Sequence, residues 1–139
     1  MSLCFPFCSL PTVVRDELAR PKAPLAVREW LANPPAWLEV RPSLQTGDKS
    51  LSDLDDGERS AILLAMELHA DLLLIDERRA ARTARRRGFR VAGTLAILGL
   101  AARRDLLSLP DAIDRLKRTS FHYSQEVLDQ FLAEQDGKA

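Results

Sequence analysis

The sequence predicts an α/β fold with a parallel sheet, and three observations support this prediction. The segment 72–75 is a continuous apolar run bounded by Asp71 and Asp76, which is typical of a buried parallel strand. Strand patterns alternate with helical patterns through the middle of the chain, as they do in α/β proteins. The length of 139 residues and the 46% apolar content suit one domain, which we expect to span residues 1–139.

Prolines and a glycine divide the first part of the chain into short elements. We expect an irregular N-terminus, two helices, a strand and a polar loop, over residues 1–10, 12–20, 25–31, 37–41 and 43–53. Pro21 and Pro24 separate the two helices, because proline interrupts a helix. Pro42 closes the strand, and Gly47 lies in the loop.

The second part predicts strands and helices in alternation, followed by helices only. The expected helices cover 55–69, 77–87, 95–104, 110–118 and 124–134, and the expected strands cover 72–75 and 89–92. Asp76 is expected to cap the helix over 77–87, Gly88 to end it, and Ser124 to cap the last helix. We expect residues 106–139 to form a C-terminal helical extension of the domain.

Composition excludes several classes of protein. The 29% charged residues and the ordinary apolar content exclude a disordered tail and a collagen-like repeat. No apolar run approaches the roughly 18 residues of a membrane span, and the first ten residues lack the basic and apolar regions of a signal peptide. Cys4 and Cys8 are too few for a disulfide framework, so we expect reduced thiols in a cytoplasmic protein.

Zero net charge conceals an uneven distribution of charge. Nine acidic residues lie between Asp48 and Glu77, whereas nine arginines and no acidic residue lie between Arg78 and Arg104. An acidic segment beside a basic one suits a site that holds a cation next to a surface that holds phosphates. The alternative is that both segments are solvated helix faces.

Three carboxylates are candidates for a metal-dependent site: Glu17, Glu58 and Asp76. Ligands of α/β proteins bind beyond the carboxyl ends of strands, where Asp76 is expected, and a chain entering at that edge brings Glu58 close. A metal-dependent nuclease needs three or four carboxylates from separate elements to hold one or two hard divalent cations, which activate water and polarise phosphate. The alternatives are that Glu58 stabilises a helix dipole, that Asp76 is an N-cap, and that Glu17 is a solvated helix residue.

Several motifs together resemble the PIN-domain-like proteins, in particular a prokaryotic subfamily of predicted nucleic-acid-binding proteins. The motifs are Leu10-Pro11-x-x-Val14-x-x-Glu17-Leu18, Gly57-Glu58-x-x-Ala61-Ile62, Leu72-Leu73-Leu74-Ile75-Asp76-Glu77-Arg78 and Gly93-Thr94-Leu95. The resemblance extends from about Phe7 to the end of the chain. It implies a three-layer α/β/α fold with a central parallel sheet.

The resemblance also implies an activity, a cofactor and partners. It implies a Mg²⁺- or Mn²⁺-dependent ribonuclease, often the toxin of a toxin–antitoxin pair, with RNA as substrate and an antitoxin protein as partner. Glu17, Glu58 and Asp76 match the second, third and fourth acidic positions of the family, with Glu77 as an auxiliary ligand. From the arginine content and the resemblance we expect RNA contacts by residues near the site, namely Arg78, Arg79, Arg82, Arg85 and Thr94.

One departure from the family pattern changes the expected activity. The family begins with a strand that carries its first acidic residue, followed by a helix, and Met1–Leu10 is too short for both. We therefore expect an N-terminally truncated fold that is weak or inactive as a nuclease and that forms homo-oligomers. Two alternatives are a non-catalytic nucleic-acid- or protein-binding module and a phospho-acceptor receiver domain. A receiver would need an acidic pair after its first strand and a lysine after its last strand, and the sequence has neither at those places.

Overall fold

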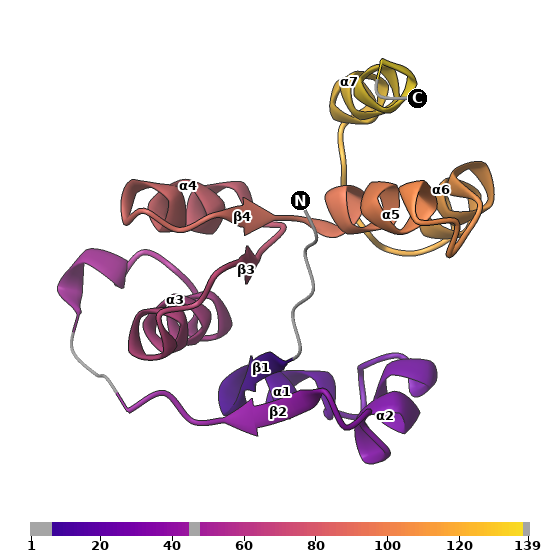
Figure 1. Ribbon diagram of the computed structural model, residues 1–139. Coiled ribbons are helices and arrows are strands. Elements are labelled where there is room, and N and C mark those ends of the chain that lie inside the picture. The colour runs from indigo at the N-terminus through magenta and orange to yellow at the C-terminus, as the bar shows by residue number, and fades with distance from the viewer. Residues whose placement is uncertain (1–6, 45–47, 138–139) are drawn as a thin grey trace. The chain divides into compact units, whose positions relative to one another are not determined.

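The computed structural model describes residues 7–44 and 48–137 of the chain. It confirms the mixed α/β fold, in which helices alternate with short strands (Figure 1). The chain divides into two compact units, the first ending at Val91 and the second beginning at Ala92. Within the described residues, no helix is long and apolar enough to cross a membrane.

A parallel pair of strands opens the first unit. Its elements are, in chain order, β1 (Cys8–Pro11), α1 (Thr12–Leu18), α2 (Leu25–Ala32) and β2 (Leu38–Arg41). The two strands pair in parallel, with Cys8 opposite Leu38 and Pro11 opposite Arg41. The helices α1 and α2 form the crossover that a parallel pair requires.

A second pair of strands flanks an arginine-rich helix. The elements that follow in this part of the chain are α3 (Asp56–Leu68), β3 (Leu73–Leu74), α4 (Arg78–Arg86) and β4 (Val91–Ala92). The Leu73 amide donates a hydrogen bond to the carbonyl oxygen of Arg90, at 2.9 Å. α4 ends before Gly88, whose φ of 89° lies in the left-handed region that favours glycine.

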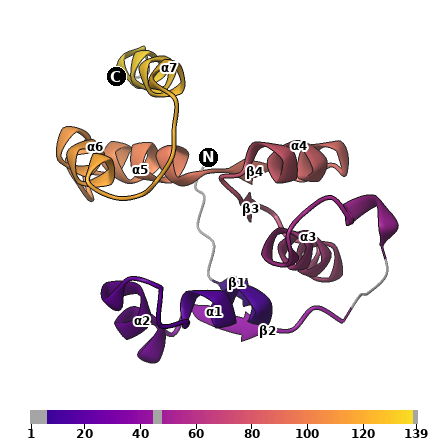
Figure 2. The ribbon, with the colours of Figure 1, turned by 180° about the vertical axis from the view of Figure 1, so that it is seen from behind.

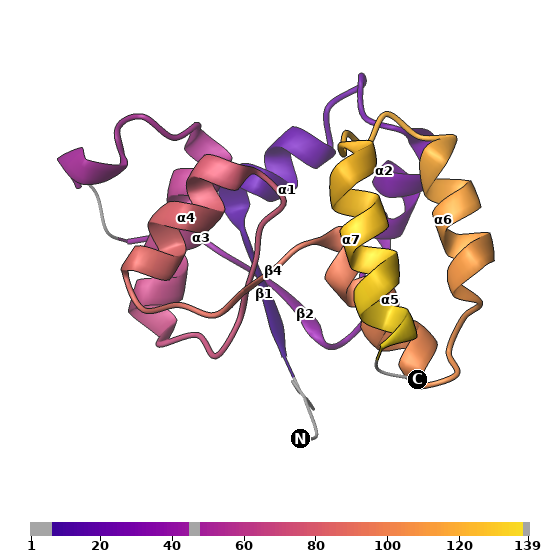
Figure 3. The ribbon, with the colours of Figure 1, turned by 90° about the horizontal axis from the view of Figure 1, so that it is seen from above.

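The helix α3 organises the packing of the first unit. It contacts α1 and β1 as well as β3 and α4 (Figures 1 and 3). Its apolar residues Ile62, Leu63 and Ala65 are buried together with Leu73 and with small residues of α4. Because α4 packs through Ala80, Ala81 and Ala84, its backbone comes close to the core while its long side chains point outward. The core therefore fixes the positions of both helix N-termini.

Three helices form the described part of the second unit, which ends at residue 137. These are α5 (Thr94–Arg103), α6 (Leu109–Lys117) and α7 (Gln125–Asp136). α5 contacts both α6 and α7 (Figure 2). Ser124 caps α7 as predicted, because its hydroxyl oxygen accepts a hydrogen bond from the Val127 amide at 3.1 Å. Leu128 and Ile113 supply the buried apolar side chains of α7 and α6.

Three expectations about local structure need correction. The N-terminus is not irregular up to residue 10, because Cys8–Pro11 form β1; residues 1–6 lie outside the described part. The loop over 43–53 contains a short 3-10 helix, η1 (Lys49–Leu51), whose N-cap Asp48 accepts the Ser50 amide; positions 45–47 lie outside the described residues. The run over 72–75 forms a two-residue strand covered on one face only, because Leu73 is buried while Leu74 is 52% exposed.

Candidate nucleic-acid and metal site

Glu58 lies in the first turn of α3, in a reciprocal cap with Asp55. The Asp55 carboxylate accepts a hydrogen bond from the Glu58 amide at 2.8 Å, and the Glu58 carboxylate accepts one from the Asp55 amide at 3.2 Å. This capping box satisfies two backbone donors that a helix N-terminus leaves without partners. It also holds the Glu58 carboxylate at the N-terminus of α3. Glu58 therefore stabilises the helix, which was the alternative to a role in metal binding.

The electrostatic surroundings of Glu58 show which groups lie near it. Partial burial is the largest influence and raises the pKa of Glu58, and the charges of Asp55 and Glu77 raise it further. The hydrogen bond from the Asp55 amide and the positive charge of Arg79 act in the opposite direction. Glu77 and Arg79 belong to the start of α4, so the structure brings the N-termini of α3 and α4 close together. A carboxylate with like-charged neighbours is a position that a cation would stabilise.

Glu77 is the N-cap of α4, a role that the sequence had suggested for Asp76. Its two carboxylate oxygens accept hydrogen bonds from the amides of Arg79, at 2.9 Å, and Ala80, at 2.8 Å. These bonds are the main reason that the pKa of Glu77 is lowered. The helix accordingly begins at Arg78 rather than at residue 77. Asp76 is exposed and lies one residue before the cap, in the segment that joins β3 to α4.

Glu17 reaches the first turn of α3 from α1. A Cβ atom placed on Gly57 would lie 3.1 Å from Oε2 of Glu17 and 3.6 Å from Oδ1 of Asp55. The two carboxylate oxygens therefore lie on the same side of the helix start, next to the residue that precedes Glu58. That Glu17 and Glu58 bind the same ligand stays a prediction. The helices that carry them, α1 and α3, are in contact.

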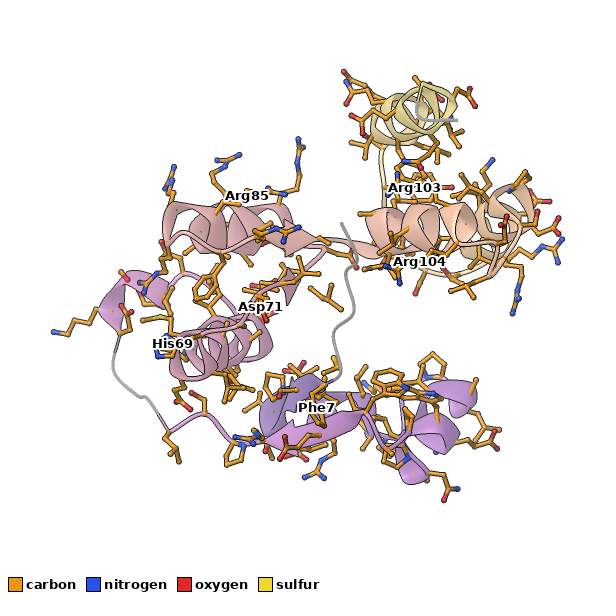
Figure 4. All side chains as sticks on the ribbon, viewed as in Figure 1. Phe7, His69, Asp71, Arg85, Arg103 and Arg104 are labelled. Carbon is orange, nitrogen blue, oxygen red and sulfur yellow. The ribbon has the colours of Figure 1, made fainter. Side chains whose placement is uncertain are left out.

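The exposed side of α4 carries arginines. Arg78, Arg79, Arg82, Arg85 and Arg86 are exposed, and we call this set the arginine face. Figure 4 shows Arg85 on the side of α4 that points away from α3. Arg87 differs, because it is partly buried and forms an ion pair with Asp48 at 2.9 Å. Its guanidinium also donates hydrogen bonds to Ser50 and to the Met66 sulfur. Arg87 therefore anchors the end of α4, and the arginine face faces solvent.

The carboxylates of this region have the chemistry of divalent-cation ligands, but their arrangement fits a cation less well. Carboxylate oxygens are the ligands that Mg²⁺ and Mn²⁺ prefer, and Glu17, Glu58 and Glu77 are placed at two adjoining helix N-termini. Within residues 7–44 and 48–137, no three His, Cys, Asp or Glu side chains come close enough together to hold a metal ion. Glu58 and Glu77 are turned toward backbone amides of their own helices.

Two residues of this region were not among the predicted site residues. Asp55 shares the capping box with Glu58, and the Asp-x-x-Glu spacing in the sequence was a sufficient signal for it. Gly57 is buried against Glu17, a contact between residues that lie far apart in the chain. Of the predicted RNA contacts, Thr94 is the first residue of α5 and belongs to the second unit.

Comparison with known proteins identifies the family. A family model described as a PIN domain matches residues 3–136, nearly the whole chain. PIN domains are nuclease-type domains that bind nucleic acid and in general depend on a divalent metal ion. No curated protein and no solved structure matches the chain. On the strength of the family match, the chain belongs to the PIN domain family.

Proposed function

We propose that this protein is a metal-dependent ribonuclease whose cation is held at the adjoining N-termini of α3 and α4. The observation that supports this most strongly is the packing of α3 against α4, which brings Glu77 within electrostatic reach of Glu58. The negative charge of Glu77 raises the pKa of Glu58, and the positive charge of Arg79 acts in the opposite direction. Membership of the PIN domain family supports this proposal, since metal-dependent nuclease chemistry needs carboxylates.

Each acidic residue has a proposed part in the site. Glu17, Glu58 and Asp76 would hold a Mg²⁺ or Mn²⁺ ion, with Glu77 as an auxiliary ligand. When bound, such an ion supplies an acidic water molecule and polarises the phosphate. Asp55 positions Glu58 through the capping box, and the α3 backbone holds both. The caps formed by Glu58 and Glu77 use one lone pair of each bonding oxygen and leave others for a cation.

The arginine face supplies a surface for the RNA backbone. Arg78, Arg79, Arg82 and Arg85 follow directly after the acidic segment, so phosphates that contact them would lie near the proposed ion. The forked guanidinium group binds phosphate by two parallel hydrogen bonds. Contact of Thr94 with the same RNA stays a prediction.

Cleavage by this chain is proposed to be weak. Among the described residues, no group of three or more His, Cys, Asp or Glu side chains is placed to hold a metal ion. A cation with fewer carboxylates binds less tightly and positions its water less well. Self-association, a role as toxin with an antitoxin partner, and a cytoplasmic location stay predictions.

A second function is favoured by one observation. Glu58 and Glu77 both serve as helix caps, and the described residues contain no ready metal cluster. A non-catalytic module that binds RNA through the arginine face would need the acidic residues only as caps. In that case the protein would bind RNA in a salt-dependent way without cleaving it.

Incubation of the purified protein with RNA and Mn²⁺ separates the two functions. We expect slow cleavage that requires Mn²⁺ and falls by at least about tenfold in Asp76→Asn and in Glu58→Gln. Glu126→Gln is the matched control, because it neutralises an exposed glutamate in the first turn of α7. Salt-dependent binding without any cleavage would support the non-catalytic module. Equal cleavage by wild type and both variants would contradict the proposed site.

A further inference from the structure

Gly57 stands out because α1 approaches it so closely. It is the second residue of α3 and is buried, although it has no side chain and lies among charged residues. A Cβ atom at this position would lie 3.1 Å from Oε2 of Glu17 and 3.4 Å from Cγ2 of Val14. The first distance is shorter than ordinary carbon–oxygen contact and the second is an ordinary van der Waals contact, so a side chain here would press on the Glu17 carboxylate.

Both contacts come from the same face of α1. Val14 and Glu17 are three residues apart, which places their side chains next to each other on a helix surface. A methyl group at residue 57 would therefore displace the Glu17 carboxylate by a few tenths of an ångström, while its contact with Val14 would be an ordinary one. The larger, branched side chain of valine would press harder on both groups, and the Glu17 carboxylate would lose its place beside Asp55.

We propose that Gly57 is a positioning residue for Glu17: by having no side chain, it lets the Glu17 carboxylate lie beside Asp55 at the start of α3. This inference rests on the proposed function, because it gives Glu17 a part in cation binding. The backbone conformation gives glycine no other reason to be here, since residue 57 lies within regular helix with φ outside the left-handed region. Alanine would otherwise be preferred at such a position.

A second glycine of the chain provides the matched control. At Gly137 an added Cβ would meet only ordinary contacts, at 3.7 Å and 3.8 Å from backbone oxygens of α7. Gly137→Ala therefore tests the general effect of replacing a glycine at a helix end, without pressing on another element. Gly88 is unsuitable as a control because of its positive φ.

The test is a double-mutant cycle between residues 57 and 17, measured by Mn²⁺ affinity in calorimetric titration. We expect Gly57→Val to weaken Mn²⁺ binding about tenfold, Gly57→Ala to weaken it less, and Gly137→Ala to leave it unchanged. Glu17→Asp shortens the side chain by one methylene and gives the new methyl groups room. In the Glu17→Asp background, the loss caused by Gly57→Val should shrink severalfold. An equal loss in both backgrounds would overturn the inference.

A metal-free measurement separates this inference from the proposed function. Thermal unfolding without Mn²⁺ is measured for the four proteins of the cycle, namely wild type, Gly57→Val, Glu17→Asp and the double variant. Gly57→Val should lower the melting temperature less when residue 17 is shortened to aspartate. If Glu17→Ala binds Mn²⁺ as tightly as wild type, the proposed cation site is wrong, while the unfolding cycle still tests the contact. If Glu17→Ala weakens binding and both cycles show no coupling, Gly57 does not position Glu17.

Discussion

The helices α3 and α7 both begin with a side-chain cap and a glutamate in the first turn, but their surroundings differ. At α7, the neutral Ser124 hydroxyl accepts the Val127 amide, and the nearby Glu126 is exposed. At α3, the cap is the charged Asp55, and Glu58 is partly buried with its pKa raised by burial and by two other carboxylates.

The comparison shows which of the acidic residues at the start of α3 are explained by helix formation. A single cap such as Ser124 contributes about 1 kcal/mol and is sufficient to begin a helix. The capping box at α3 accounts for Asp55 and Glu58 in the same way. The N-cap of α4 accounts for Glu77. Helix capping does not account for the approach of Glu17, whose Oε2 lies beside Gly57 next to the capping box. The proposed cation site would give that contact a function.

The largest predicted effect is on RNA binding by the arginine face of α4, compared with an arginine of the second unit. The variant Arg82→Ala/Arg85→Ala should bind single-stranded RNA more weakly, because each arginine that contacts a phosphate releases counterions. The slope of log affinity against log salt should fall by about 0.7 for each arginine removed. Arg115→Ala, in the last turn of α6, is the control from the second unit and should leave the slope unchanged. Equal slopes for all three proteins would mean that α4 does not contact RNA.

Removal of the two caps should have similar effects on stability. We expect Asp55→Ala and Ser124→Ala each to lower the free energy of unfolding by about 1 kcal/mol, measured by urea denaturation. Asp55→Asn should keep most of the stability, because asparagine caps as well as aspartate does. A loss in Asp55→Asn as large as in Asp55→Ala would show that the charge, rather than the cap, stabilises α3.

Those parts of the fold that depend on local chemistry could be predicted. The Ser124 cap and the end of α4 before Gly88 follow from a hydroxyl and a glycine at the right places. The prediction that Asp76 caps α4 was wrong, because two adjacent carboxylates give similar capping signals in the sequence. Glu77 caps α4 because its longer side chain reaches two backbone amides.

Features that depend on distant segments could not be predicted. β1 is only four residues long and ends in a proline, and it becomes a strand by pairing with β2. The contact of Glu17 with Gly57 likewise depends on how α1 packs on α3. Glu17 was a candidate ligand from the sequence, but nothing in the spacing of the residues placed it beside the start of α3.

The smallest predicted effect is a pH dependence of stability. The pKa of Glu58 is raised in the folded protein above the ordinary value of 4.5, so its charged form costs stability once the pH rises through the folded pKa. Glu58→Gln keeps an oxygen that accepts the Asp55 amide but carries no charge. Without metal, it should therefore unfold at slightly higher urea concentration than wild type at pH 7.

The advantage of Glu58→Gln should disappear as the pH falls below 4.5, where the wild-type carboxyl is neutral in both the folded and the unfolded state. Glu126→Gln should change stability by less than about 0.5 kcal/mol at either pH. A Glu58→Gln protein that is much less stable than wild type at pH 7 would indicate that the capping role of the charge outweighs its burial and repulsion.

The most direct test of the cation site is a calorimetric titration of Mn²⁺ into the wild type, Glu17→Gln/Glu58→Gln and Glu126→Gln/Glu134→Gln. The two double variants lose the same charge, one beside the start of α3 and the other on α7. We predict that wild type and the α7 variant bind Mn²⁺ equally and that Glu17→Gln/Glu58→Gln binds at least about tenfold more weakly. Equal Mn²⁺ affinities for all three proteins would contradict the account.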